Sequence, residues 1–319
     1  MIVDKVRVSL GSAAVLDLIP QKFKIQPSTC YLMTYIPGKC SGNCGFCPQS
    51  RSSTSTSDKL SRVTWPEFSF ERFLSKLKHL KPAKKFKRIC IQTLNYPNNF
   101  SDLRYIVQKI SEQLNINISI AIPPMSIENL KELKSKGVNR IGIALDAATP
   151  EIFRKVKGDL VKSNYTWKEH FKGLKDALKV FPENVSTHII VGLGETEKEV
   201  VELLLKLRAL KILPSLFAFT PIKGTSLGEK ERPSAEGYRK IQLSRYLIFE
   251  NDKNIDDFTF NSNGKLESIN INENYLKTII DENIAFMTTG CPNCDRPFYT
   301  SRPSGPFYNF PRKLHENEK

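Results

Sequence analysis

Three cysteines, Cys40, Cys44 and Cys47, stand within eight residues in a loop that also carries Gly42 and Gly45. Glycine lets a backbone wrap closely around a bound group. A [4Fe–4S] cluster normally takes four thiolates, so three ligands leave one iron open to a further ligand. Zinc favours paired Cys-x-x-Cys elements or Cys/His sets, and a ferredoxin supplies its fourth cysteine close by. The spacing therefore predicts a cluster with one open iron, with a zinc knuckle and an electron-transfer cluster as alternatives.

A second cysteine pair, Cys291 and Cys294, lies in a tail rich in proline, glycine and aromatic residues. Its spacing suits two ligands of a metal or cluster. Cys30 and Cys90 fall on expected strands, and they complete a set of four if both side chains point inward. A structural zinc clasp is the alternative for the tail pair, and a small buried apolar residue is the alternative for Cys90. Seven cysteines in a chain whose start lacks the apolar core of a signal peptide favour metal binding or catalysis over disulfides.

Short β-branched runs alternate with longer amphipathic stretches from about residue 28. Strands that alternate with helices pair in parallel through right-handed crossovers, and chemistry gathers at the carboxyl ends of such strands. The three-cysteine loop directly follows the first run, so it is expected at such an end. We predict an α/β fold, a partial (β/α)6 barrel, with strands at 30–36, 88–94, 118–122, 140–146, 185–191 and 215–220. Helices are expected over 127–136 and 196–210, the second with a capping box of Thr196 and Glu199.

Three regions follow from this pattern. Residues 1–27 form an N-terminal extension and residues 28–250 form the barrel. Residues 251–319 form a C-terminal hairpin and tail that carries the second cysteine pair. Asn263-Gly264 between two β-rich runs predicts the hairpin turn.

The chain carries 48 Lys and Arg against 33 Asp and Glu, a net charge of +15. Such an excess favours an acidic partner. Six lysines stand between Arg72 and Arg88 with no acid among them, although a solvated helix face explains this run equally well. No apolar stretch approaches the ~20 residues needed to cross a bilayer. The expectation is a cytoplasmic protein with no membrane contact.

The cysteine loop resembles the signature of the radical S-adenosylmethionine superfamily, Cys-x-x-x-Cys-x-aromatic-Cys after a first strand. The resemblance implies that Cys40, Cys44 and Cys47 bind three irons of a [4Fe–4S] cluster and that S-adenosyl-L-methionine chelates the fourth. Phe46 would lie against the adenine. Reductive cleavage would give a 5′-deoxyadenosyl radical that abstracts hydrogen from an unactivated carbon.

Residues 28–230 are most similar to biotin synthase and its relatives. Asp146, within Ala144-Leu145-Asp146, matches a residue that would bind the cofactor ribose, although the family has Asn where Ala144 stands. The segment with Gly192, Gly194 and Glu195 resembles the stretch near the adenine. His188 would point inward with Ser186 and contact cofactor or substrate, or it would be an ordinary hydrogen-bonded core histidine.

The chain departs from biotin synthase at that family's second, [2Fe–2S] cluster. Cys90 matches one of its cysteines, but Ser186 stands where another is expected, which puts dethiobiotin as substrate in doubt. With its tail, the chain looks like a subunit of the two-protein archaeal lipoyl synthases. That resemblance implies an auxiliary [4Fe–4S] cluster as sulfur donor, held by Cys291, Cys294, Cys30 and Cys90. Arg296 and Arg302 flank the tail pair and would bind carboxylates or a cluster, or would be surface arginines.

The function implied is radical sulfur insertion into an octanoyl chain, by a transferase of lipoate biosynthesis. The partners implied are an acidic lipoyl carrier protein bearing octanoyl-lysine, a second lipoyl synthase subunit and an electron donor such as ferredoxin. Another radical sulfurtransferase, biotin-synthase-like or a tRNA methylthiotransferase, is the alternative enzyme. A zinc-stabilised basic RNA-binding protein is the alternative outside enzymes. Nucleic acid is not expected as a partner, because no recognisable RNA-binding segment follows residue 250.

Overall fold

The computed structural model describes residues 3–23, 25–81, 84–301 and 304–314. Its centre is an eight-stranded sheet in the order β10-β9-β8-β7-β6-β2-β1-β5. The strands from β2 to β10 in this order pair in parallel, while β1 pairs antiparallel with β2 and with β5. The strands of the sheet are β1 (Lys5–Val8), β2 (Thr29–Thr34), β5 (Glu67–Ser69), β6 (Arg88–Gln92), β7 (Asn117–Ala121), β8 (Val138–Gly142), β9 (Val185–Val191) and β10 (Leu213–Ala218).

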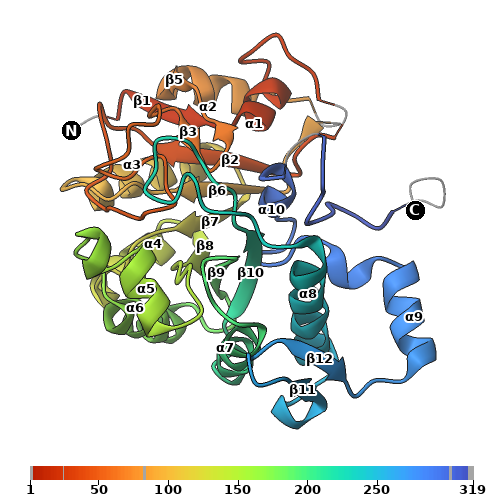
Figure 1. Cartoon of the computed structure of the whole chain (residues 1–319). Coiled ribbons are helices and arrows are strands. Elements are labelled where there is room, and N and C mark those ends of the chain that lie inside the picture. Colours follow the sequence, from red (N-terminus) through yellow and green to blue (C-terminus); the bar gives the residue numbers. More distant parts are fainter. Residues whose placement is uncertain (1–2, 24, 82–83, 302–303, 315–319) are drawn as a thin grey trace.

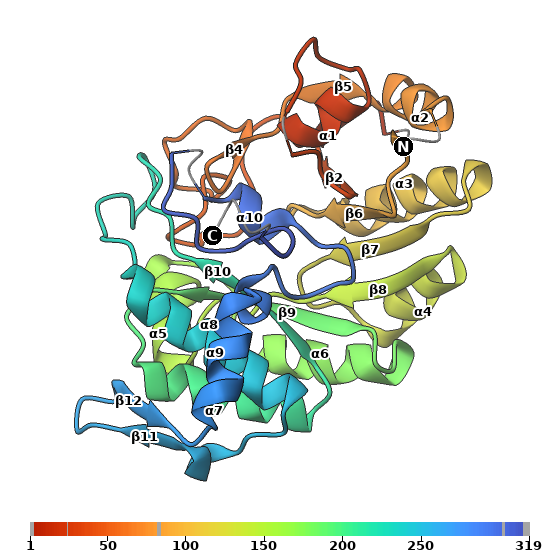
Figure 2. The same cartoon turned by 90° about the vertical axis from the view of Figure 1, so that its right-hand side faces the viewer.

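Helices cover the outer face of this curved sheet, and the C-terminal tail lies against its inner face (Figures 1 and 2). The apolar core lies between the sheet and its helices, and Ile89, Ile91 and Ile120 are fully or almost fully buried there. The α-helices are α1 (Leu10–Val15), α2 (Phe70–Lys78), α3 (Asn99–Gln113), α4 (Ile127–Ser135), α5 (Pro150–Val156), α6 (Trp167–Val180), α7 (Glu197–Ala209), α8 (Ala235–Glu250), α9 (Glu273–Asp281) and α10 (Arg296–Tyr299). Short 3-10 turns lie at η2 (Asp159–Val161), η3 (Ile255–Asp257) and η4 (Ile284–Phe286).

The predicted partial barrel of six parallel strands is confirmed. Among the described residues no pairing joins β10 to β5, so the sheet stays open. The expected fourth strand is too long, because β8 ends at Gly142 and Asp146 stands beyond it in the left-handed region at φ 64°. The capping box of α7 is confirmed: Glu199 Oε2 accepts from the Thr196 amide at 2.7 Å, and Thr196 Oγ1 accepts from the Glu199 amide at 3.2 Å.

The first residues are more closely tied to the sheet than an extension would be. β1 adds to the edge of β2 with Val6 opposite Thr34, and α1 packs behind it. A small hairpin of β3 (Lys59–Leu60) and β4 (Val63–Thr64) then follows the cysteine loop. Its second strand, β4, lies close to α10, as Figure 2 shows.

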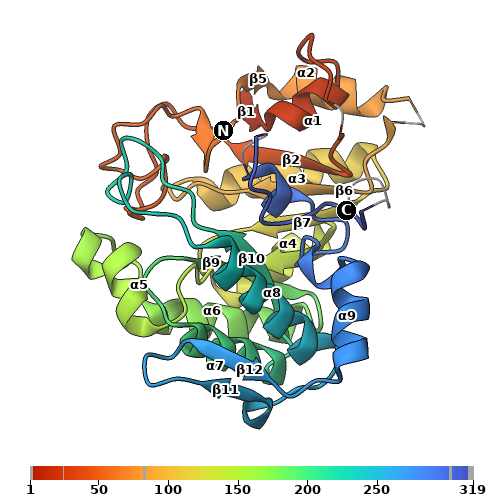
Figure 3. The same cartoon turned by 45° about the vertical axis from the view of Figure 1, so that its right-hand side comes forward.

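The predicted C-terminal hairpin is also present, as β11 (Phe258–Phe260) and β12 (Leu266–Ile269) around Asn263-Gly264. Gly264 adopts φ 71°, and a Cβ on it would stand 2.9 Å from Thr196 Cβ at the start of α7. The turn therefore needs glycine both for its backbone conformation and for this close approach. In Figure 3, this hairpin and α9 lie away from the end of the sheet where the cysteine loop is found.

None of the helices in the described parts of the chain combines the length and the apolar character that crossing a bilayer requires.

Candidate functional site

The three-cysteine loop follows β2 and is fixed by backbone hydrogen bonds to several other elements. The Cys40 amide donates to Gln49 O at 2.9 Å, the Ser41 amide to Asn95 O at 2.7 Å and the Gly45 amide to Val156 O at 2.7 Å. The loop therefore lies at the carboxyl ends of the parallel strands, where the sequence predicted it.

Gly42 and Gly45 both serve a close approach in this loop. A Cβ on Gly42 would lie 3.0 Å from the Tyr165 ring, and one on Gly45 would lie 3.4 Å from Leu227. Any side chain at Gly42 would therefore displace Tyr165.

The three thiols lie on one short loop, where Cys40 raises the pKa of both Cys44 and Cys47, and Cys47 raises that of Cys44. Burial is the main cause that raises the pKa of Cys44 well above its ordinary value and that of Cys47 to about 12. Two backbone amides, of Gly42 and Asn95, point at Cys40 Sγ at 3.3 and 3.1 Å. Partly buried, grouped thiols with amides aimed at sulfur fit a site where an iron–sulfur group deprotonates and binds them.

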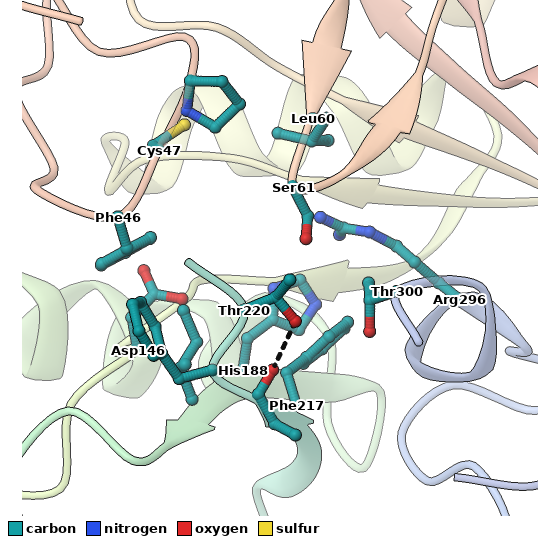
Figure 4. A pocket seen from close by; sticks show the side chains of 14 residues that line it. Phe46, Cys47, Leu60, Ser61, Asp146, His188, Phe217, Thr220, Arg296 and Thr300 are labelled. Carbon is teal, nitrogen blue, oxygen red and sulfur yellow. Dashed lines mark hydrogen bonds between the residues drawn. The ribbon is translucent and has the colours of Figure 1, made fainter. Parts of the chain in front are cut away.

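A pocket opens beside this loop, lined by side chains from the loop, from β3, β9 and β10 and from the tail (Figure 4). Phe46 and Asp146 lie on one side of it, and Arg296 and Thr300 of the tail lie opposite, with His188 between. Phe46 is half-buried against an apolar cluster that includes Phe153. The pocket joins the expected cofactor residues Cys47, Phe46, Asp146 and His188 around one space.

Asp146 forms an ion pair that the sequence did not reveal. Its Oδ2 lies 2.7 Å from Lys157 Nζ, which also donates to Ala144 O at 2.6 Å. The side chains are only 11% and 6% exposed, so the pair is buried. Lys157 also lowers the pKa of Cys44, against the larger effect of burial. A single lysine after a short helix carries no sequence signal, which is why Lys157 was missed.

The turn after β9 lies outside the lining of this pocket, and its place near the adenine stays a prediction. Gly192, Gly194 and Glu195 do not line the pocket beside Asp146. Instead, the Glu195 carboxylate accepts from the amides of Gly192 and Leu193, and burial raises its pKa. Gly192 adopts φ 105° and Gly194 φ 124°. In this structure the three residues form the turn itself.

His188 lies on β9 facing the inner side of the sheet, as expected from its alternation with Ser186. It packs edge-on against Phe217, with ring centroids 5.2 Å apart. Burial is the main cause that lowers the pKa of His188 to about 3, with Arg296 adding to the effect. Its imidazole is therefore neutral at neutral pH.

The tail carries the second cysteine pair to the amino-terminal ends of the strands. Asn293 O accepts from Thr29 Oγ1 at 2.7 Å at the start of β2, and Pro292 O accepts from Arg88 Nε at 3.3 Å at the start of β6. Arg88 is thus buried and anchors the tail, although it ends the basic run of the sequence. The two cysteine groups consequently lie at opposite ends of the same inner face.

Cys90 joins the tail pair, and Cys30 does not. Cys90, Cys291 and Cys294 line one small cavity, where Cys291 Sγ lies 3.7 Å from Ser186 Oγ. Burial, with a smaller contribution from Cys291, raises the pKa of Cys294 to about 12 and that of Cys90 to about 11.

Cys30 is fully buried in the outer core, on the other face of β2 from Tyr31. The expectation that Cys30 completes a set of four is therefore corrected: alternation along β2 turns it outward.

Tyr31 stands where Cys30 was expected. Its hydroxyl donates to Asp295 Oδ1 at 2.6 Å and lies 3.8 Å from Cys294 Sγ.

Arg296 lies between the two cysteine groups, donates to Gln92 Oε1 at 2.5 Å and lies over the Phe217 ring at 5.3 Å. Arg302 lies outside the described residues.

The seven cysteines are free thiols. Across the described ranges, no three or more His, Cys, Asp or Glu side chains are gathered around a point that could hold a single metal ion.

Comparisons with known proteins agree with this arrangement. A family model described as the radical SAM superfamily matches residues 34–207. Biotin synthase of Sulfurihydrogenibium sp. is 27% identical over 240 residues, which cover 70% of this chain and 66% of that protein. Biotin synthase of Synechocystis sp. is 26% identical over 230 residues, covering 69% and 60%. The match thus spans less than two thirds of the length of these relatives.

Solved structures support the fold. Methylornithine synthase superposes with a TM-score of 0.54 at 19% identity, over 75% of this chain and 67% of that one. A maturase of the [FeFe]-hydrogenase superposes with a TM-score of 0.55 at 16% identity, over 69% and 50%. At these identities the likeness shows a shared α/β architecture.

Proposed function

Because the chain belongs to the radical S-adenosylmethionine superfamily, in its biotin-synthase-like branch, we propose that it inserts sulfur into an unactivated C–H of an octanoyl chain on a lipoyl carrier protein. The observation that supports this reading is the second thiol group. Cys90, Cys291 and Cys294 meet at the far end of the inner face from Cys40, Cys44 and Cys47. A sulfur-insertion enzyme needs one place to make a radical and another to supply sulfur.

When bound, a [4Fe–4S] cluster with S-adenosyl-L-methionine would supply the radical chemistry, and an auxiliary cluster would supply the sulfur. Cys40, Cys44 and Cys47 would hold the first group. Phe46 offers an apolar wall for the adenine, and the Asp146 carboxylate, fixed by Lys157, offers an acceptor for ribose hydroxyls. The neutral His188 imidazole and the Arg296 guanidinium lie between the two thiol groups.

The tail supplies cysteines that the barrel strands lack relative to biotin synthase. Ser186 stands where that family is expected to carry a cysteine, and the thiol of Cys291 lies against it from the tail. The second thiol group therefore combines one strand cysteine with two tail cysteines. This difference supports a substrate other than dethiobiotin.

The partners proposed are an acidic carrier bearing octanoyl-lysine, a second related subunit and an electron donor such as ferredoxin. The net charge of +15 favours electrostatically steered docking of an acidic domain. Lysines of α2, Lys76 and Lys78, are exposed and suit such a surface.

Iron and acid-labile sulfide per chain, measured after anaerobic reconstitution, test the two sites. We expect about eight irons in the wild type and about four after Cys40→Ala/Cys44→Ala/Cys47→Ala. The triple variant Cys90→Ala/Cys291→Ala/Cys294→Ala should also hold about four. Cys30→Ser is the matched control and should keep about eight, because Cys30 faces the outer core. A wild type with only about four irons would remove the sulfur-donor site and the lipoyl proposal with it.

The second step assays turnover of an octanoyl-lysine carrier with both subunits and S-adenosyl-L-methionine. Sulfur-containing product detected by mass spectrometry supports the proposal. Formation of 5′-deoxyadenosine without sulfurated product, in protein that holds both clusters, would leave the radical chemistry and reject this substrate.

A further inference from the structure

An apolar cavity lies beside the two thiol groups and belongs to neither. It is enclosed by α1 and the chain that follows it, by the β3–β4 hairpin and by α10. Leu10, Phe23, Val63, Trp65 and Tyr299 supply much of its wall. Its charged lining residues are Arg62 and Arg296. No residue of the cysteine loop lines it, so it is not the pocket beside Asp146.

The size of the cavity suits a medium-length hydrocarbon chain. Its volume is about 220 Å³. An apolar cavity of about 150 Å³ takes up benzene, which has six carbons, so the same scale gives room for about nine carbons here. Apolar cavities favour apolar occupants, because water needs polar partners that such walls do not offer.

The cavity is adjacent to both thiol groups, because it shares wall residues with the site of each. Leu60, Arg296 and Thr300 line both this cavity and the pocket that contains Cys47 and Asp146. Tyr31 lines both this cavity and the small cavity of Cys90, Cys291 and Cys294, with its hydroxyl 3.8 Å from Cys294 Sγ. A chain that enters as far as Tyr31 and Leu60 is thus brought between the two groups.

The Trp65 indole forms part of the wall. The Trp65 side chain lines the cavity, is only 2% exposed and packs edge-on against Tyr31. Its indole N–H finds no acceptor within the part of the chain that the structure describes. That nitrogen is itself inaccessible from the cavity, so Trp65 contributes apolar surface to the wall.

We infer that this cavity binds the acyl chain of an N-acyl-lysine of about eight carbons and presents it between the two thiol groups. The inference rests on the proposed function for the kind of substrate. The cavity, its size and the wall residues that it shares with the two thiol sites are properties of this chain.

Photo-crosslinking to the cluster-loaded full-length chain tests the site without requiring turnover. The probe is a peptide whose lysine carries an octanoyl analogue with a diazirine in the acyl chain. We expect crosslinks on the segments with Leu10, Val63 and Tyr299, displaced by an octanoyl-lysine peptide and not by an acetyl-lysine peptide. Displaceable crosslinks on other segments, or none that octanoyl-lysine displaces, would overturn the inference.

Two substitutions at Val63 separate cavity size from general damage. Val63→Phe should weaken octanoyl-lysine binding about tenfold or more and shift preference to shorter acyl chains, as a misfit of one or more methylenes does. Val63→Ala should shift the preference to longer chains. Ile280→Phe adds a ring on α9, where the side chain is 49% exposed, and should leave both values unchanged. An unchanged chain-length preference in both Val63 variants would overturn the inference.

These outcomes are distinct from failure of the proposed function. If crosslinks map to the cavity but octanoyl-lysine is never sulfurated, the cavity assignment stands and the sulfur-insertion proposal falls. If octanoyl-lysine is sulfurated while the crosslinks lie elsewhere, the enzyme proposal stands and the cavity assignment falls.

Discussion

Replacing Lys157 with methionine should destabilise the protein strongly, because it leaves the Asp146 carboxylate buried without its partner. Lys157 Nζ makes two short hydrogen bonds, of 2.7 Å to Asp146 and 2.6 Å to Ala144 O. Hydrogen bonds to a charged group contribute about 1.5–3 kcal/mol each, which sums to roughly 3–6 kcal/mol. Removing one partner of a buried ion pair costs about 3–5 kcal/mol, so this estimate agrees with the sum over the two hydrogen bonds.

The chain offers a matched control two residues away. Lys155 pairs with Glu151 at 2.6 Å, but these side chains are 57% and 74% exposed. An exposed pair of this kind contributes about 0.3–0.5 kcal/mol. Lys155→Met therefore removes the same chemical group from the same helix region at a small fraction of the cost.

Urea unfolding of the metal-free chains, followed by circular dichroism, measures the difference. We expect the free energy of unfolding to fall by about 3 kcal/mol or more for Lys157→Met and by less than about 1 kcal/mol for Lys155→Met. The double variant Asp146→Asn/Lys157→Met should recover part of the loss, since the uncompensated charge is gone. Equal losses in the two single variants would refute the reasoning, because burial would then have no effect on the pair.

Three further predictions concern the turn after β9, the buried histidines and the tail. Gly192→Ala should lower the melting temperature more than Gly194→Ala. Both residues have positive φ, but only at position 192 would a Cβ meet Pro233, at 2.8 Å from its Cδ. Equal losses would show that Pro233 moves aside without cost. Burial lowers the pKa of His188 to about 3 and that of His170 to about 2, so below pH 6.5 the unfolded chain binds more protons than the folded chain and stability falls as the pH falls. At pH 5 each histidine should lower the free energy of unfolding by about 2 kcal/mol. His188→Phe should flatten that pH dependence in urea titrations of the metal-free chain. Tyr31→Phe removes the hydroxyl that donates to Asp295 at 2.6 Å and should speed hydrogen exchange in residues 291–300 severalfold, whereas Tyr105→Phe, on the outer helix α3, should not.

The sequence predicts the parallel strands well because each is a short, largely apolar run, mostly β-branched, bounded by turn residues. The place of the cysteine loop follows from the same pattern, since it comes directly after one such run. The fourth strand ends earlier than expected for a local reason: Asp146 leaves the strand conformation at φ 64°, held by hydrogen bonds to His188 O and from Ile190 N. No pattern of residue types announces that turn.

What the sequence could not give is the orientation of β2 and the path of the tail. Thr29–Thr34 is buried on both faces, so its composition does not tell which side faces the inner cavity. Alternation fixes only that Cys30 and Tyr31 point in opposite directions. The tail contacts that show which face of β2 points inward join residues more than 260 positions apart, such as Tyr31 with Asp295.

The path of the tail also sets an order of events during synthesis. The ligand loop and all the parallel strands precede residue 219, so the first thiol group can assemble while the chain is still growing. Cys90 must wait on its strand until residues 291–294 have emerged and reached the starts of β2 and β6. The two thiol groups are therefore completed at different times, and the later one only when the last elements of the chain return to the first.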